Sequence, residues 1–227
     1  IDGLMLSAYS GLKSTGIYSI AFFIAVLVEV PRRSLSQVLI PIVSEANKNN
    51  DVAKLKQLYE KSSLNQLIVG GLLFIGIWCN IDSIFQLIPR GDIYIQGKWV
   101  VFFIGLSKLF DMATGINAEI IGTSKYYKID LLFFLFLALL GIVANIILIP
   151  MYQITGAAIA SAISVFLFNS MRFAFIAVKY KMQPFSLSTL AVLAIGIFLT
   201  YGSQYIPHLR EPVSDILLRS VVVGSVF

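Results

Sequence analysis

The sequence is poor in cysteine, histidine and charged residues. Cys79 and His208 are the single residues of their types, so an internal disulfide is excluded and neither a Cys/His metal cluster nor a Ser-His-Asp triad has support. Charged residues make up 13% of the chain, whereas about 25% is usual in soluble domains. A soluble protein of 227 residues needs a polar shell that so few charges do not supply. The composition therefore argues against a soluble domain, and we expect no catalytic residue, metal site or cofactor.

Long hydrophobic runs dominate what is present, since 58% of the residues are hydrophobic. Runs of about 20 apolar residues are typical of membrane-spanning helices, whereas barrel strands are shorter and alternate. We therefore predict an all-α, polytopic transmembrane helix bundle that forms a single domain over residues 1–227. The predicted spans cover residues 17–43, 64–88, 98–121, 129–149, 154–178, 187–206 and 213–227, preceded at 1–9 by the tail of another helix. Because the chain begins without methionine and ends inside the last run, we expect it to be a fragment.

The connectors between the predicted spans differ in positive charge. Connectors 44–63, 122–128 and 179–184 contain eight lysines, and the connectors that alternate with them contain only Lys13, Arg90, Lys98 and Arg210. Cytoplasmic loops carry the excess of Lys and Arg, so we predict that the first set is cytoplasmic. This explains the net charge of +5 without a nucleic-acid partner, because the basic residues form no stripe.

The longest of these connectors has a helix-start signal at Asn50-Asp51, followed by Val52, Leu55 and Leu58 at helical spacing. It is predicted to be a short amphipathic helix that lies along the inner membrane surface with its lysines towards anionic lipid. The alternative is a flexible charged hairpin.

Small residues repeat at four-residue intervals in the span 154–178. Gly156, Ala160 and Ser164 form one such series. Small residues allow helix backbones to approach closely, so this pattern predicts tight helix packing and carries no chemistry.

Ionisable residues inside the spans are the candidates for function. A charge at bilayer depth costs about 2.5–3.5 kcal/mol on insertion scales, so it normally faces a bundle interior or water. In the first span Glu29 and Arg33 form an i,i+4 pair, and Arg32 shares their broad face. Arg32 has no second carboxylate nearby in sequence, which favours contact with an anionic ligand.

Further candidates lie in later spans. Lys108 and Asp111 form an i,i+3 pair, and Glu119 returns to nearly the angular position of Lys108 on a continuous helix. Arg172 lies near the cytoplasmic end of its span, where it could extend to the interface. Two interpretations stay open for all these charges: mutual neutralisation that fixes helix register, or a wet cavity that binds a ligand. Asp130, which begins a span, is expected to cap it or lie at the interface.

Uncharged polar residues inside spans have a structural interpretation. Asn117, Asn145 and Asn169 are predicted to bridge neighbouring helices by hydrogen bonds.

Several segments, taken in order, resemble the C-terminal half of bacterial polysaccharide flippases. They are 2–6 (DGLML), 16–21 (GIYSIA), Pro31 with Leu35, 38–41 (VLIP), Gly122 with Tyr126, 145–152 (NIILIPMY) and 155–160 (TGAAIA). The last two are similar to the N-x-x-L-I-P-x-Y-x-x-x-GAA-x-A region of that family. The resemblance covers nearly the whole chain.

The resemblance implies a Wzx-like O-antigen or capsule flippase of the multidrug/oligosaccharidyl-lipid/polysaccharide superfamily, in the bacterial cytoplasmic membrane. It implies two MATE-like lobes, of which this chain is the C-terminal one and the N-terminal lobe is the missing partner. The implied substrate is a polyprenyl-diphosphate-linked glycan, moved by alternating access with coupling to Na⁺ or H⁺. The candidate cavity residues are Glu29, Arg32, Arg33, Lys108, Asp111, Glu119 and Arg172.

Three other functions compete with this one. A drug or cation antiporter of the same superfamily would favour a cavity rich in carboxylates and poor in arginine, which the paired arginines oppose. An integral-membrane glycan polymerase or acyltransferase would need a large extracytoplasmic loop, and the connectors near Arg90 and Pro150 are short. A non-transporting scaffold would neutralise all its buried charges in pairs.

Overall fold

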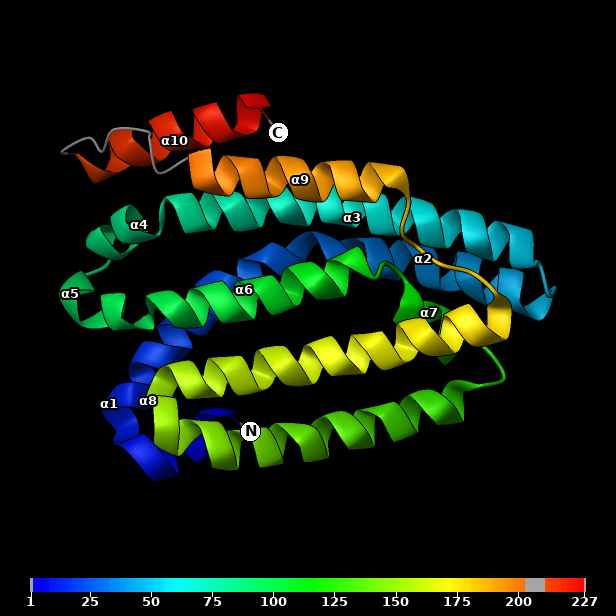
Figure 1. Ribbon diagram of the computed structural model, residues 1–227, viewed down its shortest axis with the longest axis horizontal. Coiled ribbons are helices and arrows are strands. Elements are labelled where there is room, and N and C mark those ends of the chain that lie inside the picture. The colour runs from blue at the N-terminus through cyan, green and yellow to red at the C-terminus, as the bar shows by residue number, and fades with distance from the viewer. Residues whose placement is uncertain (1, 203–210, 227) are drawn as a thin grey trace.

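The chain folds as an all-α bundle, which confirms the predicted fold class. The computed structural model describes residues 2–202 and 211–226, and this part of the chain contains no strand (Figure 1). The elements are α1 (Asp2–Val26), the 3-10 turn η1 (Leu27–Glu29), α2 (Val30–Lys48), α3 (Val52–Cys79), α4 (Ile81–Leu87), α5 (Gly91–Tyr94), the 3-10 turn η2 (Ile95–Gly97), α6 (Lys98–Ala113), α7 (Asn117–Gly122), α8 (Tyr127–Tyr180), α9 (Leu187–Gly202) and α10 (Pro212–Val226).

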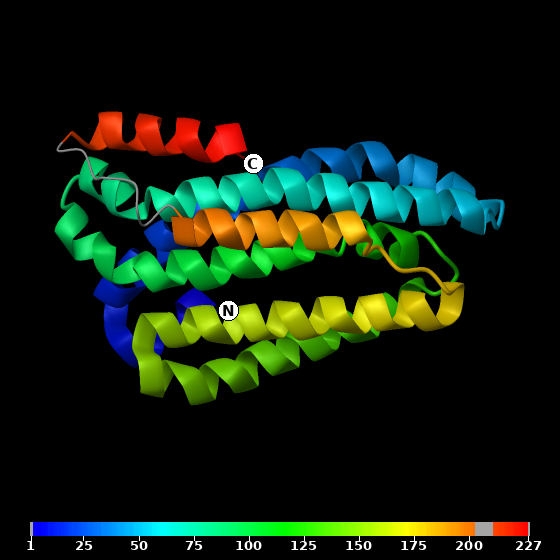
Figure 2. The same cartoon turned by 45° about the horizontal axis from the view of Figure 1, so that its top comes forward.

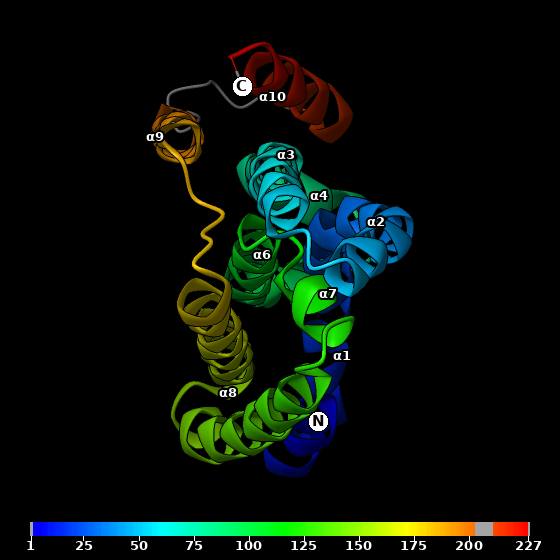
Figure 3. The ribbon, with the colours of Figure 1, turned by 90° about the vertical axis from the view of Figure 1, so that its right-hand side faces the viewer.

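The long helices run along a common direction, and Figure 3 shows them nearly end-on. Helix α6 packs against α1, α3 and α8, whereas α9 packs on α3 and α10 packs on α3 and α4. Leu6, Ala21, Ile104 and Ala157 belong to one buried cluster between α1, α6 and α8. A second cluster joins α2, α3 and α7 through Val43, which is fully buried. The core thus has one part around α6 and another between α2, α3 and α7.

Helices α1 and α2 form one helical stretch with two interruptions. Gly11 has a left-handed φ of 79°, a conformation that glycine adopts at little cost, and it separates the first residues from the span predicted at 17–43. The second interruption is η1, directly before Pro31 in the first turn of α2. Proline is tolerated in a first turn because that turn leaves its N–H groups unpaired. Glu29 and Arg32 therefore lie at a change of helix geometry.

Helix α3 begins before the predicted span 64–88. Asp51 caps its N-terminus, since its carboxylate accepts a hydrogen bond from the backbone N–H of Lys54 at 2.9 Å. The connector is helical as the pattern indicated, but it continues without a break into the span (Figure 1). The prediction of a separate helix along the membrane surface is therefore wrong. Leu55 and Tyr59 explain the difference, because both are buried in the bundle.

The span predicted at 98–121 is interrupted. Helix α6 ends at Ala113 and α7 begins at Asn117, and Gly115 between them has φ +60°. A side chain at Gly115 would lie 3.0 Å from the backbone nitrogen of Ser63 on α3. The hydroxyl of Ser63 donates a hydrogen bond to the carbonyl oxygen of Ala113 at 2.6 Å. Close contact with α3 therefore accompanies the break, and the assumption of one continuous helix is wrong.

Helix α8 is a hairpin of two arms, which Figures 1 and 2 show side by side. Its non-helical residue is Gln153, with φ 50° and ψ −125°, between the spans predicted at 129–149 and 154–178. Pro150 lies just before this reversal. The small-residue series of the second arm begins at Gly156, immediately after it.

Gly156→Ala is expected to destabilise the bundle by about 1–3 kcal/mol, because an added methyl group is overpacked. The Cβ would lie 2.0 Å from the carbonyl oxygen of Leu148, which is backbone and cannot rotate away. Thermal unfolding of the purified protein measures the effect. Gly141→Ala on the other arm is the control, since the nearest atom there is the Ser164 hydroxyl at 3.8 Å. Equal melting temperatures for the two variants would contradict the prediction.

Several long apolar helices fit a membrane protein. Among the described residues, four helical stretches are long and apolar enough to cross a membrane: Asp2–Lys48, Val52–Cys79, Gly91–Ala113 and Tyr127–Tyr180. Helix α9 is apolar but shorter, and the predicted span 187–206 extends beyond it into residues outside the described part. Helix α10 occupies most of the range predicted at 213–227.

The three lysine-rich connectors lie at one end of the bundle, on the right in Figure 1. Residues of all three, including Lys48, Lys125 and Lys179, line one common cavity there. At the opposite end lie α4, α5 and the reversal of α8. Arg210 and His208 lie outside the described residues. The lysine-rich connectors on which the predicted orientation rests are therefore also close together in space, at one end of the bundle.

Candidate functional site

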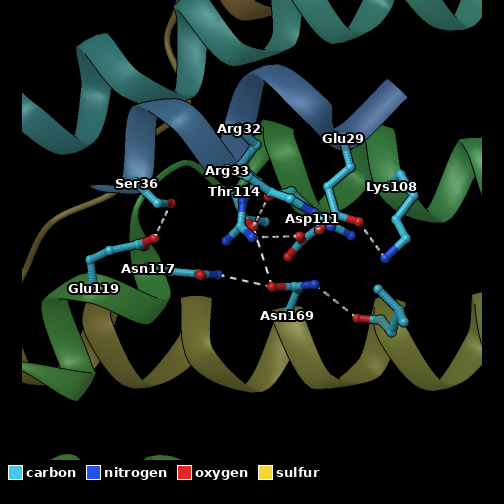
Figure 4. Close-up of polar contacts among 11 residues, drawn as sticks. Glu29, Arg32, Arg33, Ser36, Lys108, Asp111, Thr114, Asn117, Glu119 and Asn169 are labelled. Atoms are coloured by element: carbon cyan, nitrogen blue, oxygen red, sulfur yellow. Dashed lines mark hydrogen bonds and ion pairs between the residues drawn. The ribbon is translucent and has the colours of Figure 1, made fainter. Parts of the chain in front are cut away.

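A charged cluster joins α2, α6 and α7 in the interior of the bundle (Figure 4). It starts at Glu29, near the middle of the helical stretch Asp2–Lys48. The cluster contains six charged residues that the sequence singled out, Glu29, Arg32, Arg33, Lys108, Asp111 and Glu119, together with the polar residues Ser36, Thr114, Asn117 and Asn169.

Arg32 pairs with Asp111 across the α2–α6 interface. The distance between Arg32 Nη1 and Asp111 Oδ2 is 2.9 Å, and both side chains are 13% exposed. The sequence had suggested a pair between Lys108 and Asp111 on one helix and no carboxylate for Arg32. Both expectations are wrong because η1 packs against α6, which brings Glu29 and the first turn of α2 next to Lys108 and Asp111.

Glu29 connects two cations. Its Oε2 lies 2.5 Å from Lys108 Nζ on α6, and its Oε1 lies 3.5 Å from Arg33 Nε one turn further along the chain. The second contact confirms the predicted Glu29–Arg33 pair, although the distance between nitrogen and oxygen is long. Arg33 keeps 63% of its side chain exposed, whereas Glu29 is only 12% exposed. Arg33 is therefore the most exposed cation of the cluster.

The cluster combines a balanced charge with unused hydrogen-bond donors. Its three cations and three carboxylates cancel. Arg32 Nε and Nη2 are buried and make no hydrogen bond with any residue that the structure describes. A buried donor without an acceptor costs free energy, about 1–3 kcal/mol or more for a charged group.

Glu119 is on α7 and not on the helix of Lys108. Its Oε1 accepts a hydrogen bond from the Ser36 hydroxyl on α2, and its Oε2 is buried without a hydrogen bond from the described residues. The predicted alignment of Glu119 with Lys108 is wrong because the chain breaks at 114–116. The sequence pattern missed Ser36, whose position one turn after Arg32 and Arg33 was the only available signal.

An amide network closes the cluster against α8. Asn117 Nδ2 donates to Asn169 Oδ1 at 3.2 Å, and the Thr114 hydroxyl lies 2.8 Å from the carbonyl oxygen of Asp111. Asn145 donates to Asp2 Oδ1 at 2.8 Å, between the first arm of α8 and α1. The predicted bridging role of these three asparagines is confirmed. Thr114 was missed, because its role depends on the break after α6.

Arg172 forms a separate pair within the α8 hairpin. Its Nε and Nη2 lie 2.7 and 2.8 Å from the two oxygens of Asp130, and both residues are buried. Its guanidinium also lies 4.0 Å from the ring centroid of Phe168. Extension of Arg172 to the membrane surface and a capping role for Asp130 are therefore wrong. The hairpin brings together two residues that no local spacing connects.

The observed pairs predict which double substitutions the fold tolerates. Replacing Lys108 and Asp111 together by methionine and leucine is expected to cost about 1–3 kcal/mol more than Glu29→Leu with Lys108→Met, because the first change removes one partner from each of two ion pairs. Denaturant unfolding in detergent measures both variants. If Lys108 paired with Asp111 instead, as the i,i+3 spacing suggests, the variant that replaces Glu29 and Lys108 would be the less stable one. That result would overturn the pairing of Lys108 with Glu29 and of Asp111 with Arg32.

The described residues of the charged cluster include no set of metal ligands. No group of three or more His, Cys, Asp or Glu side chains is placed to hold a metal ion within residues 2–202 and 211–226. The chemistry available at the cluster is electrostatic, through the guanidinium groups of Arg32 and Arg33.

Comparison with known proteins gives one distant similarity. No protein-family profile matches the chain, and no solved structure matches it. The chain is 28% identical to the "Capsular polysaccharide biosynthesis protein CapF" of Staphylococcus aureus. The aligned region covers 73% of this chain and 42% of that relative, so the chain spans less than half of the relative's length.

Proposed function

We propose that the chain is the C-terminal lobe of a flippase that moves a polyprenyl-diphosphate-linked oligosaccharide across the bacterial cytoplasmic membrane during surface polysaccharide biosynthesis. It transports its substrate by alternating access against an N-terminal lobe and catalyses no covalent step. The distant similarity to a capsular polysaccharide biosynthesis protein supports the process, and the apolar helices support the location.

The observation that carries this proposal is the pair of adjacent arginines in the bundle. A diphosphate needs compensating positive charge to leave water, and guanidinium groups match phosphate geometry with paired donors. Arg33 offers an exposed guanidinium, and Arg32 has two donors that no described residue satisfies. Glu29 and Asp111 hold both arginines in place and would release donors to a bound anion. The sugars would occupy a wet route while the lipid tail stays in the bilayer.

Deletion of the gene, followed by measurement of lipid-linked oligosaccharide on each membrane leaflet and of surface polysaccharide, tests the proposal. The expected result is accumulation on the cytoplasmic leaflet and loss of surface glycan. A plasmid copy should restore export, and a copy with Arg32→Ala and Arg33→Ala should not. Normal glycan on both sides, in a strain without a second flippase, would reject flipping and favour small-molecule antiport.

A further inference from the structure

A cavity of about 390 Å³ opens at the lysine-rich end of the bundle, separate from the charged cluster. Its wall combines the C-terminal end of α2, the start of α3, the segment between α7 and α8, and the end of α8. These are the segments that meet at the right-hand end of Figure 1. The cavity therefore lies at one end of the helices that are long and apolar enough to cross a membrane.

Three lysines line this cavity without a carboxylate. Lys48, Lys125 and Lys179 each come from a different connector, and none of them pairs with a carboxylate among the described residues. Elsewhere at this end Lys54 pairs with Glu45. No Asp or Glu of the described chain is among the lining residues. Like charges that gather without a counter-charge repel each other, and an anion between them would remove this cost.

The ring of Tyr126 lies close to two of the lysines. Lys125 Nζ and Lys179 Nζ each lie 5.3 Å from the ring centroid of Tyr126. Tyr180 also lines the cavity, and tyrosines are enriched at the level of lipid headgroups. The amide of Asn47 is fixed by hydrogen bonds to the Ile120 carbonyl at 3.0 Å and to the Thr123 hydroxyl at 2.7 Å. Segments that are far apart in sequence thus combine to form the wall of the cavity.

We propose that this cavity binds the phosphate headgroup of an anionic phospholipid of the adjacent leaflet. Basic pockets between membrane helices on the cytoplasmic side bind such headgroups. Val52 and Leu55 give one side of the cavity an apolar lining that suits the start of an acyl chain. The membrane itself supplies this ligand at high local concentration. The site ties together the end of α2, the start of α3, the segment after α7 and the end of α8. Because α2 and α7 also carry residues of the charged cluster, lipid binding would stabilise the arrangement of that cluster.

Native mass spectrometry of the full chain, purified in detergent and titrated with phosphatidylglycerol or phosphatidylcholine, tests this site. Phosphatidylglycerol should be retained in preference to phosphatidylcholine. Replacing Lys48, Lys125 and Lys179 by glutamine should weaken phosphatidylglycerol binding about fivefold for each lysine. Lys61, Lys128 and Lys181 give a matched control, because they come from the same three connectors, are exposed and do not line the cavity. Their replacement by glutamine changes the net charge equally and should leave binding unchanged.

Three results would overturn the proposal. Equal loss in both triple variants would show general surface attraction, and equal retention of phosphatidylcholine would show no headgroup selectivity. Displacement of the lipid by equimolar glycerol phosphate would assign the cavity to a soluble phosphate. Should the cavity triple variant not fold, Lys125→Gln with Lys128→Gln as its control gives the same comparison. None of these results depends on glycan export, so the site and the proposed flippase function are tested independently.

Discussion

Replacing Arg172 by methionine is expected to lower the free energy of unfolding by about 3–5 kcal/mol, because it leaves the buried carboxylate of Asp130 without its counter-charge. Arg172 is 4% exposed and Asp130 8%. The pair is bidentate, and the guanidinium also packs on Phe168. It connects the two arms of the α8 hairpin, so its loss should separate them. Denaturant unfolding of the purified protein in detergent measures the change.

Two further variants separate the ion pair from the loss of a side chain. Arg172→Met combined with Asp130→Leu should recover most of the stability, because no buried charge is then left alone. Arg90→Met is a matched control, since Arg90 is exposed and its replacement should change stability little. An effect of Arg172→Met as small as that of Arg90→Met would show that the pair does not hold the hairpin.

Features set by local spacing could be predicted from the sequence. The helical class followed from the apolar runs, because a backbone surrounded by apolar side chains of that length must pair its own polar groups. The bridging asparagines followed from the cost of leaving an amide unpaired among apolar residues. Gly156 was identified because small residues at four-residue spacing fall on one helix face, and the structure places it against the Leu148 carbonyl.

Partners across helices could not be predicted from spacing. The i,i+3 rule assigned Lys108 to Asp111, whereas the structure pairs Lys108 with Glu29 and Asp111 with Arg32. Which residues meet depends on the rotation and height of α2 against α6, and one sequence does not contain that information. The i,i+4 spacing gave a valid answer for Glu29 and Arg33, which are neighbours on one helical stretch.

The interruption between α6 and α7 shows a second limit. Gly115 was an isolated glycine in an apolar run, and such a residue is tolerated inside helices at a cost of about 1 kcal/mol. What distinguishes it is its φ of +60° together with the approach of Ser62 and Ser63 on α3, whose nearest atoms would lie 3.0 Å from an added Cβ. Glu119 consequently turns to Ser36 on α2. A tertiary contact thus decided the direction of a candidate site residue.

Arg33→Ala is expected to reduce glycan export roughly tenfold to a hundredfold while protein abundance stays normal. The magnitude follows from the loss of a hydrogen bond to a charged group, about 1.5–3 kcal/mol. Abundance should persist because Arg33 is 63% exposed and Glu29 keeps Lys108 as its closer partner. Surface polysaccharide and immunoblotting in a complemented deletion strain measure the two quantities. This prediction rests on the proposed flippase function.

Arg32→Ala provides the contrast that locates the function within the cluster. It removes the partner of Asp111, whose side chain is 13% exposed, so both abundance and export should fall. Arg32→Ala with Asp111→Ala should restore abundance, because neither charge of the pair is then left without its partner. It should not restore export, because the guanidinium donors of Arg32 are gone. Arg33→Lys keeps the charge but not the paired donors, so partial export is expected. Normal export by both Arg33→Ala and the double variant would remove the arginines from the substrate path and leave the cluster a purely structural link between α2 and α6.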